Sequence, residues 1–112
     1  ETLGLIDRRR LALLKKGAHV IIISRGGIVD EEALTDSLAS GHLGGAGIDA
    51  FLNEPLSNES ALWDMPNVVI SPHSSALTTN MVEGRRKIFE ENLKRYLSNE
   101  PFLYTCNKID GY

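Results

Sequence analysis

A cationic, an acidic and an imidazole side chain each follow a short apolar run of this sequence. Arg25 follows AHVIIIS, Glu54 comes shortly after GGAGIDAF, and His73 comes two residues after NVVIS. Each run is rich in β-branched residues or glycine and predicts a buried strand. Because ligands of open α/β sheets bind outside the carboxyl ends of parallel strands, we expect these side chains to lie together. A cation, a carboxylate and an imidazole in one place indicate acid/base chemistry on an anionic substrate.

Each of the three side chains also has an ordinary explanation when it is taken alone. An arginine after a strand is often a surface ion-pair partner, and a glutamate before a proline is often a simple loop carboxylate. Most single histidines do no chemistry. Both interpretations therefore stay open at the level of single residues.

The composition excludes several classes of partner. The 112 residues are 42% apolar and 24% charged, as in one soluble globular domain or part of one. A formal charge of -3 offers no excess of basic residues for nucleic acid, and the run Arg8 to Arg10 suits a solvated helix face. No apolar stretch approaches the roughly 20 residues that span a bilayer. We therefore expect neither a nucleic-acid nor a membrane partner.

The single cysteine, Cys106, cannot form an internal disulfide. No Cys/His cluster has the spacing of a zinc site, so no metal is expected. Cys106 has no histidine nearby in the sequence and is interpreted as structural or incidental. This cysteine usage fits a reducing, cytoplasmic setting.

The first part of the chain predicts a helix, a strand and a second helix. Asp7 can cap a helix over residues 8–16, with Gly17 as its stop. Residues 18–24 are apolar on both faces, which is typical of a central strand in a parallel sheet covered by helices. Asp30 can cap the next helix, which Gly41 would end.

The rest of the chain predicts two strands and a long helix. Glycines at 44, 45 and 47 indicate a strand that another group approaches closely, with Asp49 at its end. A long connection with one turn of helix around Ala61 leads to a strand over residues 67–71. Asn80 and Glu83 form a capping-box pattern for an amphipathic helix running to about Ser98. This order of elements predicts a doubly wound α/β fold with a parallel sheet.

Three motifs in this order carry a family resemblance: SRGGIVDEEAL, GAGIDAFLNEPL and LWDMPNVVISPHS. They resemble the second half of the cofactor domain of the D-isomer-specific 2-hydroxyacid dehydrogenases. The resemblance implies the second half of a Rossmann-type doubly wound parallel sheet with flanking helices and a long C-terminal helix. It implies that residues 1–101 are the C-terminal part of the NAD-binding domain, including the helix that returns towards the substrate domain. Residues 102–112 would be a tail that starts that return.

The resemblance also implies roles for the three side chains. Arg25 would grip the substrate carboxylate and polarise the oxo group, a task that suits the planar guanidinium fork. His73 would be the general acid that protonates the carbonyl oxygen, and the base in the reverse direction. Glu54 would hold His73 in register, and a carboxylate beside an imidazole favours its protonated form.

Further family positions imply contacts with NAD or NADP. Asp49 matches a position that lies against the nicotinamide carboxamide, although an Asx turn that closes the strand is the alternative. The implied cofactor-side residues are Ile23, Ser24, Arg25, Asp49, His73, Ser74, Ser75 and Ala76.

The sequence departs from the family pattern in two places. Ile22 replaces an asparagine that many members carry three residues before the arginine. Ser74, Ser75 and Ala76 replace the glycine or aromatic residues often found after the histidine. A larger difference is that the GxGxxG turn that cradles a pyrophosphate, the acidic residue for the ribose and most of the substrate domain come, in the family, before the stretch that this sequence resembles. We therefore expect these residues to be a fragment of a longer enzyme, with weak affinity for NAD on their own.

The resemblance predicts an oxidoreductase that interconverts 2-oxo acids and D-2-hydroxy acids with NADH or NADPH, a homodimer when intact. One alternative is a non-catalytic relative that keeps the fold as a binding or scaffolding module. The other is a truncated product that is inactive on its own.

Overall fold

The computed structural model of the protein describes residues 2–109. They divide into two compact units, Glu1–Ser75 and Ala76–Tyr112, and each is described here by itself. The first unit contains α1 (Arg8–Ala12), β1 (Ala18–Ile22), α2 (Glu31–Ala39), β2 (Leu43–Ile48), the 3-10 helix η1 (Ala61–Asp64) and β3 (Val68–Ile70). The second unit contains α3 (Thr79–Leu97).

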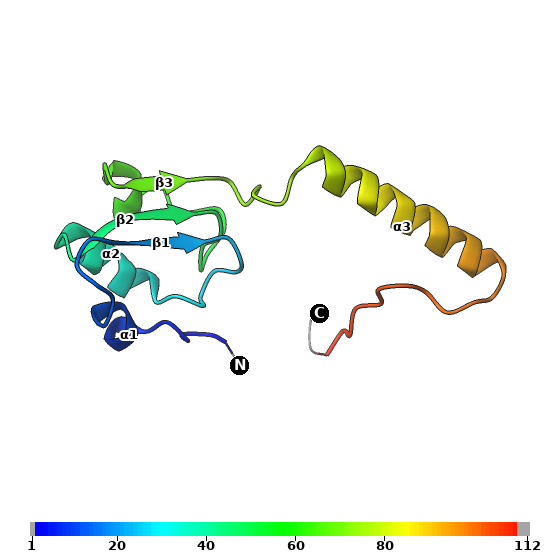
Figure 1. Cartoon of the computed structure of the whole chain (residues 1–112), viewed down its shortest axis with the longest axis horizontal. Coiled ribbons are helices and arrows are strands. Elements are labelled where there is room, and N and C mark those ends of the chain that lie inside the picture. Colours follow the sequence, from blue (N-terminus) through cyan, green and yellow to red (C-terminus); the bar gives the residue numbers. More distant parts are fainter. Residues whose placement is uncertain (1, 110–112) are drawn as a thin grey trace. The chain divides into compact units, whose positions relative to one another are not determined.

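The three strands form one parallel sheet in the order β1-β2-β3. Figure 1 shows the three arrowheads pointing the same way. The register aligns Ile22, Ile48 and Ile70 near the carboxyl ends of the strands. The predicted parallel α/β sheet is therefore confirmed, and the segments carrying Arg25 and His73 leave it at the same edge.

The core lies between the sheet and its two helices. α2 packs against β2, and α1 packs against α2. Leu11, Leu34 and Leu43 are completely buried or nearly so. Burial of this apolar stripe, rather than helix propensity, holds short helices such as α1 in place.

Both predicted N-caps of the first unit are confirmed. Asp7 accepts a hydrogen bond from the backbone N–H of Arg10 at 2.8 Å, and Asp30 accepts one from that of Ala33 at 3.0 Å. Gly41 follows the C-cap of α2 with a left-handed φ of 70°. These local signals therefore set the bounds of α2 as predicted.

The first helix is shorter than predicted, because α1 ends at Ala12 rather than near residue 16. The backbone N–H of Gly17 donates to the carbonyl of His42 at 2.7 Å, and that of Ala18 donates to Lys15 at 3.0 Å. The residues before Gly17 must therefore turn the chain into β1, and they cannot continue the helix.

The expectation that β1 is buried on both faces is wrong for the described chain. Ile21 and Ile23 are 67% and 63% exposed, and Val69 of β3 is 73% exposed on the same face as Ile21. Within residues 2–75, α1 and α2 cover the opposite face only. The apolar run therefore predicted the strand correctly, but it did not predict that one face of the strand is exposed in the described residues.

In the second unit, the N-cap of α3 lies two residues before the predicted cap at Asn80. The side chain of Thr78 accepts from the backbone N–H of Met81 at 3.1 Å and is the N-cap. Glu83 does not reach back to a cap, because its carboxylate pairs with Arg86 at 2.7 Å. The predicted cap was therefore two residues too late, and the predicted capping box does not form.

The chain after α3 folds back along it. Asn92 exchanges two hydrogen bonds with the backbone of Leu103, and the rings of Tyr96 and Phe102 stack 6.3 Å apart. No residue of α3 is buried, although the helix is amphipathic as predicted. None of the helices within residues 2–109 has the length and apolar character needed to cross a membrane.

Candidate active site

Glu54 and His73 form a hydrogen-bonded pair next to the carboxyl edge of the sheet. Nδ1 of His73 lies 2.8 Å from Oε2 of Glu54 and 2.9 Å from Oε1. An ionised carboxylate only accepts hydrogen bonds, so the proton of this contact is on Nδ1. Nε2 is then the nitrogen left to exchange a proton with a ligand. The pair is partly open, with 41% of the His73 side chain and 38% of the Glu54 side chain exposed.

The backbone at His73 is unusual for a residue with a side chain. Its φ is 52°, in the left-handed region that favours glycine. Such conformations persist where surrounding contacts enforce them, and they gather at functional sites. The loop of residues 71–75 therefore presents this imidazole in an enforced orientation.

Glu54 is held by a second donor besides the imidazole. The backbone N–H of Phe51 donates to Oε1 of Glu54 at 3.0 Å. The hydrogen bond from His73 and then that from Phe51 lower the pKa of Glu54 from its ordinary value. The carboxylate is therefore ionised at neutral pH and faces the imidazole with a full negative charge.

Asp49 is the buried charged residue of the site, with 2% of its surface exposed. Its Oδ1 accepts from the hydroxyl of Ser71 at 2.6 Å and from the N–H of Ser74 at 2.8 Å, while Oδ2 accepts from the N–H of Ser75 at 2.9 Å. Hydrogen bonds from Ser71 first, and then from Ser75, hold the pKa of Asp49 well below its ordinary value despite burial. Asp49 is therefore an anion within the loop that carries His73.

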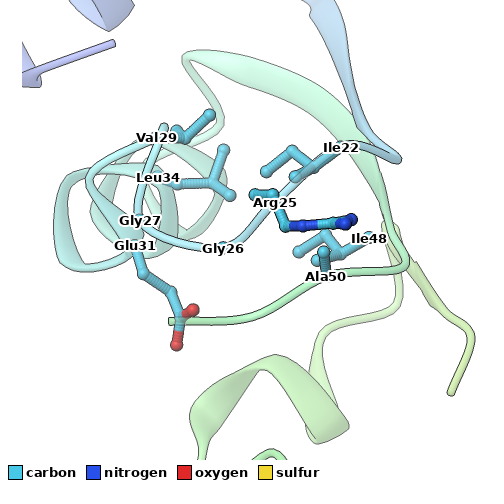
Figure 2. Close-up of a pocket in the computed structure, with 9 residues that line it drawn as sticks. All are labelled: Ile22, Arg25, Gly26, Gly27, Val29, Glu31, Leu34, Ile48 and Ala50. Carbon is cyan, nitrogen blue, oxygen red and sulfur yellow. The ribbon is translucent and has the colours of Figure 1, made fainter. Parts of the chain in front are cut away.

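Arg25 is exposed just beyond β1, and its Nη1 donates to the carbonyl of Ser24 at 2.8 Å. Figure 2 shows its guanidinium lying beside Ile48 and Ala50, at the end of β2, while Glu31 points away from it. No carboxylate within residues 2–109 forms an ion pair with Arg25. The guanidinium therefore keeps donors free for an anionic ligand.

The turn after Arg25 is packed tightly against the loop that leads to Glu54. A Cβ at Gly26 would overlap the carbonyl of Phe51, and Gly27 has a left-handed φ of 80°. Glu31 adds a second link, since its Oε2 accepts from the N–H of Leu52 at 3.1 Å. These contacts place the two loops side by side.

The other predicted cofactor-side residues are spread over both units. Ile23 and Ser24 are exposed directly after β1, and Ser74 and Ser75 follow His73 with their N–H groups occupied by Asp49. Ala76 opens the second unit, where its carbonyl accepts from Thr78. The first unit therefore brings all of these residues except Ala76 to the ends of its strands.

A cavity of about 400 Å³ opens beside the hydrogen-bonded pair. Glu54 and His73 line one part of it, and Pro55, Leu56 and Trp63 contribute much of the rest. The indole N–H of Trp63 donates to the carbonyl of Ser57 at 2.9 Å. The pair therefore borders a mainly apolar recess as well as solvent.

Sequence reasoning missed Ser71, Glu31 and the backbone of Phe51 as parts of the site. A hydroxyl two residues before His73 was a visible signal for Ser71, whereas the other two depend on contacts between distant segments. Within the described part of the chain, no three or more metal-ligating side chains gather in one place.

A family model for the NAD-binding domain of the D-isomer specific 2-hydroxyacid dehydrogenases matches residues 1–75. The chain belongs to this family. As a family member it is 44% identical over 100 residues to glyoxylate/hydroxypyruvate reductase B of Pectobacterium carotovorum subsp. carotovorum, covering 89% of this chain and 31% of that protein. It is 38% identical over 111 residues to D-3-phosphoglycerate dehydrogenase of Mycobacterium leprae, covering 99% of this chain and 21% of that one. The chain thus spans about a fifth to a third of these two relatives.

Solved structures of 2-hydroxyacid dehydrogenases share the fold. The D-isomer specific 2-hydroxyacid dehydrogenase of Xanthobacter autotrophicus Py2, in complex with NADPH and MES, superposes with a TM-score of 0.82 at 39% identity. That match covers 99% of this chain and 45% of the other. The NADPH-dependent glyoxylate/hydroxypyruvate reductase of Sinorhizobium meliloti, in complex with NADP and sulfate, gives 0.81 at 37% identity, covering 99% and 36%. The three-stranded sheet is therefore part of a dehydrogenase Rossmann domain, as predicted.

Proposed function

We propose that this chain carries the catalytic half-site of an oxidoreductase that interconverts 2-oxo acids and D-2-hydroxy acids. The observation that carries the proposal is the Glu54–His73 pair, whose Nδ1 and Oε2 atoms are 2.8 Å apart in a chain of this dehydrogenase family. A reduction of this kind needs one proton for the carbonyl oxygen and one hydride for its carbon. The cofactor, when bound, supplies the hydride.

His73 is the proposed general acid, and its Nε2 is the atom that delivers the proton. Nδ1 faces a carboxylate that only accepts hydrogen bonds, so the ring keeps one proton on Nδ1 and carries the proton to be delivered on Nε2. Delivery from Nε2 leaves a neutral imidazole still hydrogen-bonded through Nδ1. The reverse reaction uses the same nitrogen as a base.

Arg25 is the proposed substrate anchor. Its planar fork can donate parallel hydrogen bonds to a carboxylate and to the neighbouring oxo group. The absence of an ion-pair partner within residues 2–109 supports this role, because no bound carboxylate must first be displaced. Arg25 and the His73 loop follow β1 and β3, which lie on either side of β2 and end at the same edge of the sheet.

Ile23, Ser24, Arg25, Asp49, His73, Ser74, Ser75 and Ala76 are the residues we propose for the cofactor side. Ile23 exposes 63% of its surface just beyond β1, and this apolar surface suits the flat nicotinamide ring of the cofactor. The N–H groups of Ser74 and Ser75 already bind Asp49, so Ser74 would meet the cofactor through its hydroxyl. The cofactor is NAD or NADP.

The proposed substrates are small 2-oxo acids, and the proposed assembly is a cytoplasmic homodimer. Glyoxylate and hydroxypyruvate are the first candidates, since the similar reductases of Pectobacterium and Sinorhizobium are named for them. We further propose that residues 1–101 belong to the NAD-binding domain and that residues 102–112 begin the return to the substrate domain.

The test is a reductase assay of the full-length protein with glyoxylate and hydroxypyruvate, each with NADH and NADPH. We expect turnover with at least one pair, and turnover lowered by about 10² to 10⁴ after His73→Ala. Binding of cofactor with no turnover on any small 2-oxo acid would contradict the proposal and favour a non-catalytic binding module.

A further inference from the structure

The hydrogen bonds of Asp49 bracket His73 on both sides. Ser71 lies two residues before the histidine, and Ser74 and Ser75 follow it directly. All three donors come from one five-residue loop, and the carboxylate that receives them lies at the end of the neighbouring strand, β2. The backbone N–H of Asp49 is itself bound to the carbonyl of Ile22 at 2.8 Å. We call the three hydrogen bonds from Ser71, Ser74 and Ser75 to Asp49 the bracket. Through Asp49 the bracket is attached to β2, the middle strand of the sheet.

The bracketed loop needs such an anchor. His73 has a φ of 52°, which an unrestrained residue with a Cβ seldom adopts. Within the loop, the N–H of His73 donates to the carbonyl of Ser71 at 3.0 Å. This local contact does not connect the loop to the sheet. The N–H of Ser71 donates to the carbonyl of Ile48 at 3.0 Å and ties the start of the loop to β2, and the three bonds to Asp49 hold the loop on both sides of His73.

The chemistry of the bracket calls for a carboxylate. Its donors are hydroxyl and backbone N–H groups, so an acceptor-only group satisfies all of them. An asparagine would keep one oxygen but would place an NH₂ group against at least one donor. Among residues 2–109 no cation pairs with Asp49, and the buried charge is balanced by the loop donors themselves.

We propose that Asp49 is a positioning residue that holds residues 71–75 so that Nδ1 of His73 meets Glu54 and Nε2 stays free for proton transfer. The inference rests on the proposed function and deepens it, because the sequence led us to expect either a cofactor contact or an Asx turn at Asp49. A cofactor contact would act on binding of NADH or NADPH. A positioning role acts on the step in which His73 moves its proton.

The test compares Asp49→Asn with the unmodified full-length protein. Asp36→Asn is the matched control, since that carboxylate is exposed and pairs with Arg8 at 2.7 Å on the surface of α2. Amide hydrogen exchange at Ser74 and Ser75 is measured by NMR. Turnover with a 2-oxo acid and the dissociation constant of NADPH are measured separately.

In Asp49→Asn we expect exchange at Ser74 and Ser75 to accelerate about tenfold or more, as lost hydrogen bonds to a charged group imply. Turnover should fall by a similar factor, and by more than the NADPH dissociation constant rises. Unchanged exchange would overturn the proposal. A raised dissociation constant of NADPH with unchanged turnover would also overturn the proposal, because it would mean that Asp49 acts only by contacting the cofactor.

Ser71→Ala is the second variant, in case Asp49→Asn does not fold. It removes only the hydroxyl donor, so exchange at Ser74 and Ser75 should rise by less than in Asp49→Asn. Exchange at the level of the unmodified protein would again overturn the bracket. If the unmodified protein reduces no 2-oxo acid, the proposed function fails, and the exchange measurements still decide whether Asp49 holds the loop.

Discussion

Gly26 lies directly against the backbone of Phe51, with no room for a Cβ between them. Gly26 follows Arg25, and Phe51 donates its N–H to Glu54. This one contact therefore joins the turn that carries the guanidinium to the loop that carries the carboxylate. The distance between the Arg25 guanidinium and the Glu54 carboxylate therefore depends on Gly26, because only a residue without a side chain allows the two segments to approach this closely.

Gly26→Ala should destabilise the first unit and weaken activity. The added methyl must push the Phe51 backbone away, and overpacking of this kind costs about 1–3 kcal/mol. Urea unfolding followed by the fluorescence of Trp63 measures the change. Gly41→Ala is the control for backbone strain, because its φ is 70° but nothing lies within 4 Å of its Cβ position.

The control should also lose stability, by about 1 kcal/mol from its left-handed backbone. It should keep the activity of the unmodified protein, since Gly41 lies at the far end of α2. Equal losses of activity in both variants would argue against the coupling of the two loops through Gly26.

His73→Ala should lower turnover by about 10² to 10⁴, the usual contribution of acid/base assistance. The dissociation constant of NADPH should change far less, because the lost interaction belongs to the transition state. Steady-state kinetics and a fluorescence titration measure the two effects. His19→Ala, on β1, is the matched control. Unchanged turnover in His73→Ala would remove the proton-donor assignment.

Arg25→Lys should raise the Michaelis constant for the 2-oxo acid and lower turnover. An ammonium ion is a point charge and cannot reproduce two parallel hydrogen bonds. The loss of one charged hydrogen bond predicts about a tenfold or larger fall in kcat/KM. Arg9→Lys, at an exposed position of α1, should change neither constant. An effect of Arg25→Lys on thermal stability alone would count against the anchor role.

The Glu54–His73 pair predicts a pH dependence of stability. The pKa of Glu54 is lowered in the folded protein, first by its bond to His73 and then by that to Phe51. The ionised Glu54 therefore adds to the free energy of unfolding. This stabilisation is fully present above the ordinary glutamate pKa of 4.5, and it is lost as the pH falls through the lowered pKa of the folded protein. Urea unfolding at a series of pH values should show Glu54→Gln converging on the unmodified protein in acid.

A double-mutant cycle tests whether His73 causes this effect. In the His73→Ala background, Glu54→Gln should cost less stability at neutral pH than in the unmodified protein. In that background the substitution should still lower the free energy of unfolding slightly, because the N–H of Phe51 also donates to the Glu54 carboxylate. An unchanged cost would mean that the imidazole does not stabilise the carboxylate.

Local signals in the sequence were reliable where a short segment decides its own structure. Asp7 and Asp30 cap their helices as predicted, and the apolar run before Arg25 is a strand. The cap of α3 was misplaced, since Thr78 and Asn80 offer similar side chains two residues apart. The predicted roles of Arg25, Glu54 and His73 stay predictions until their variants are measured.

The sequence by itself determined the parallel α/β order and the placement of Arg25, Glu54 and His73 beyond strand ends. Apolar periodicity and capping residues act over a few positions, so they can be read from the chain. Only the tertiary structure decided that Asp49 binds the N–H groups of Ser74 and Ser75, and that Gly26 meets Phe51. These contacts join residues 25 or 26 positions apart, and they exist because neighbouring strands in the sheet bring their ends together.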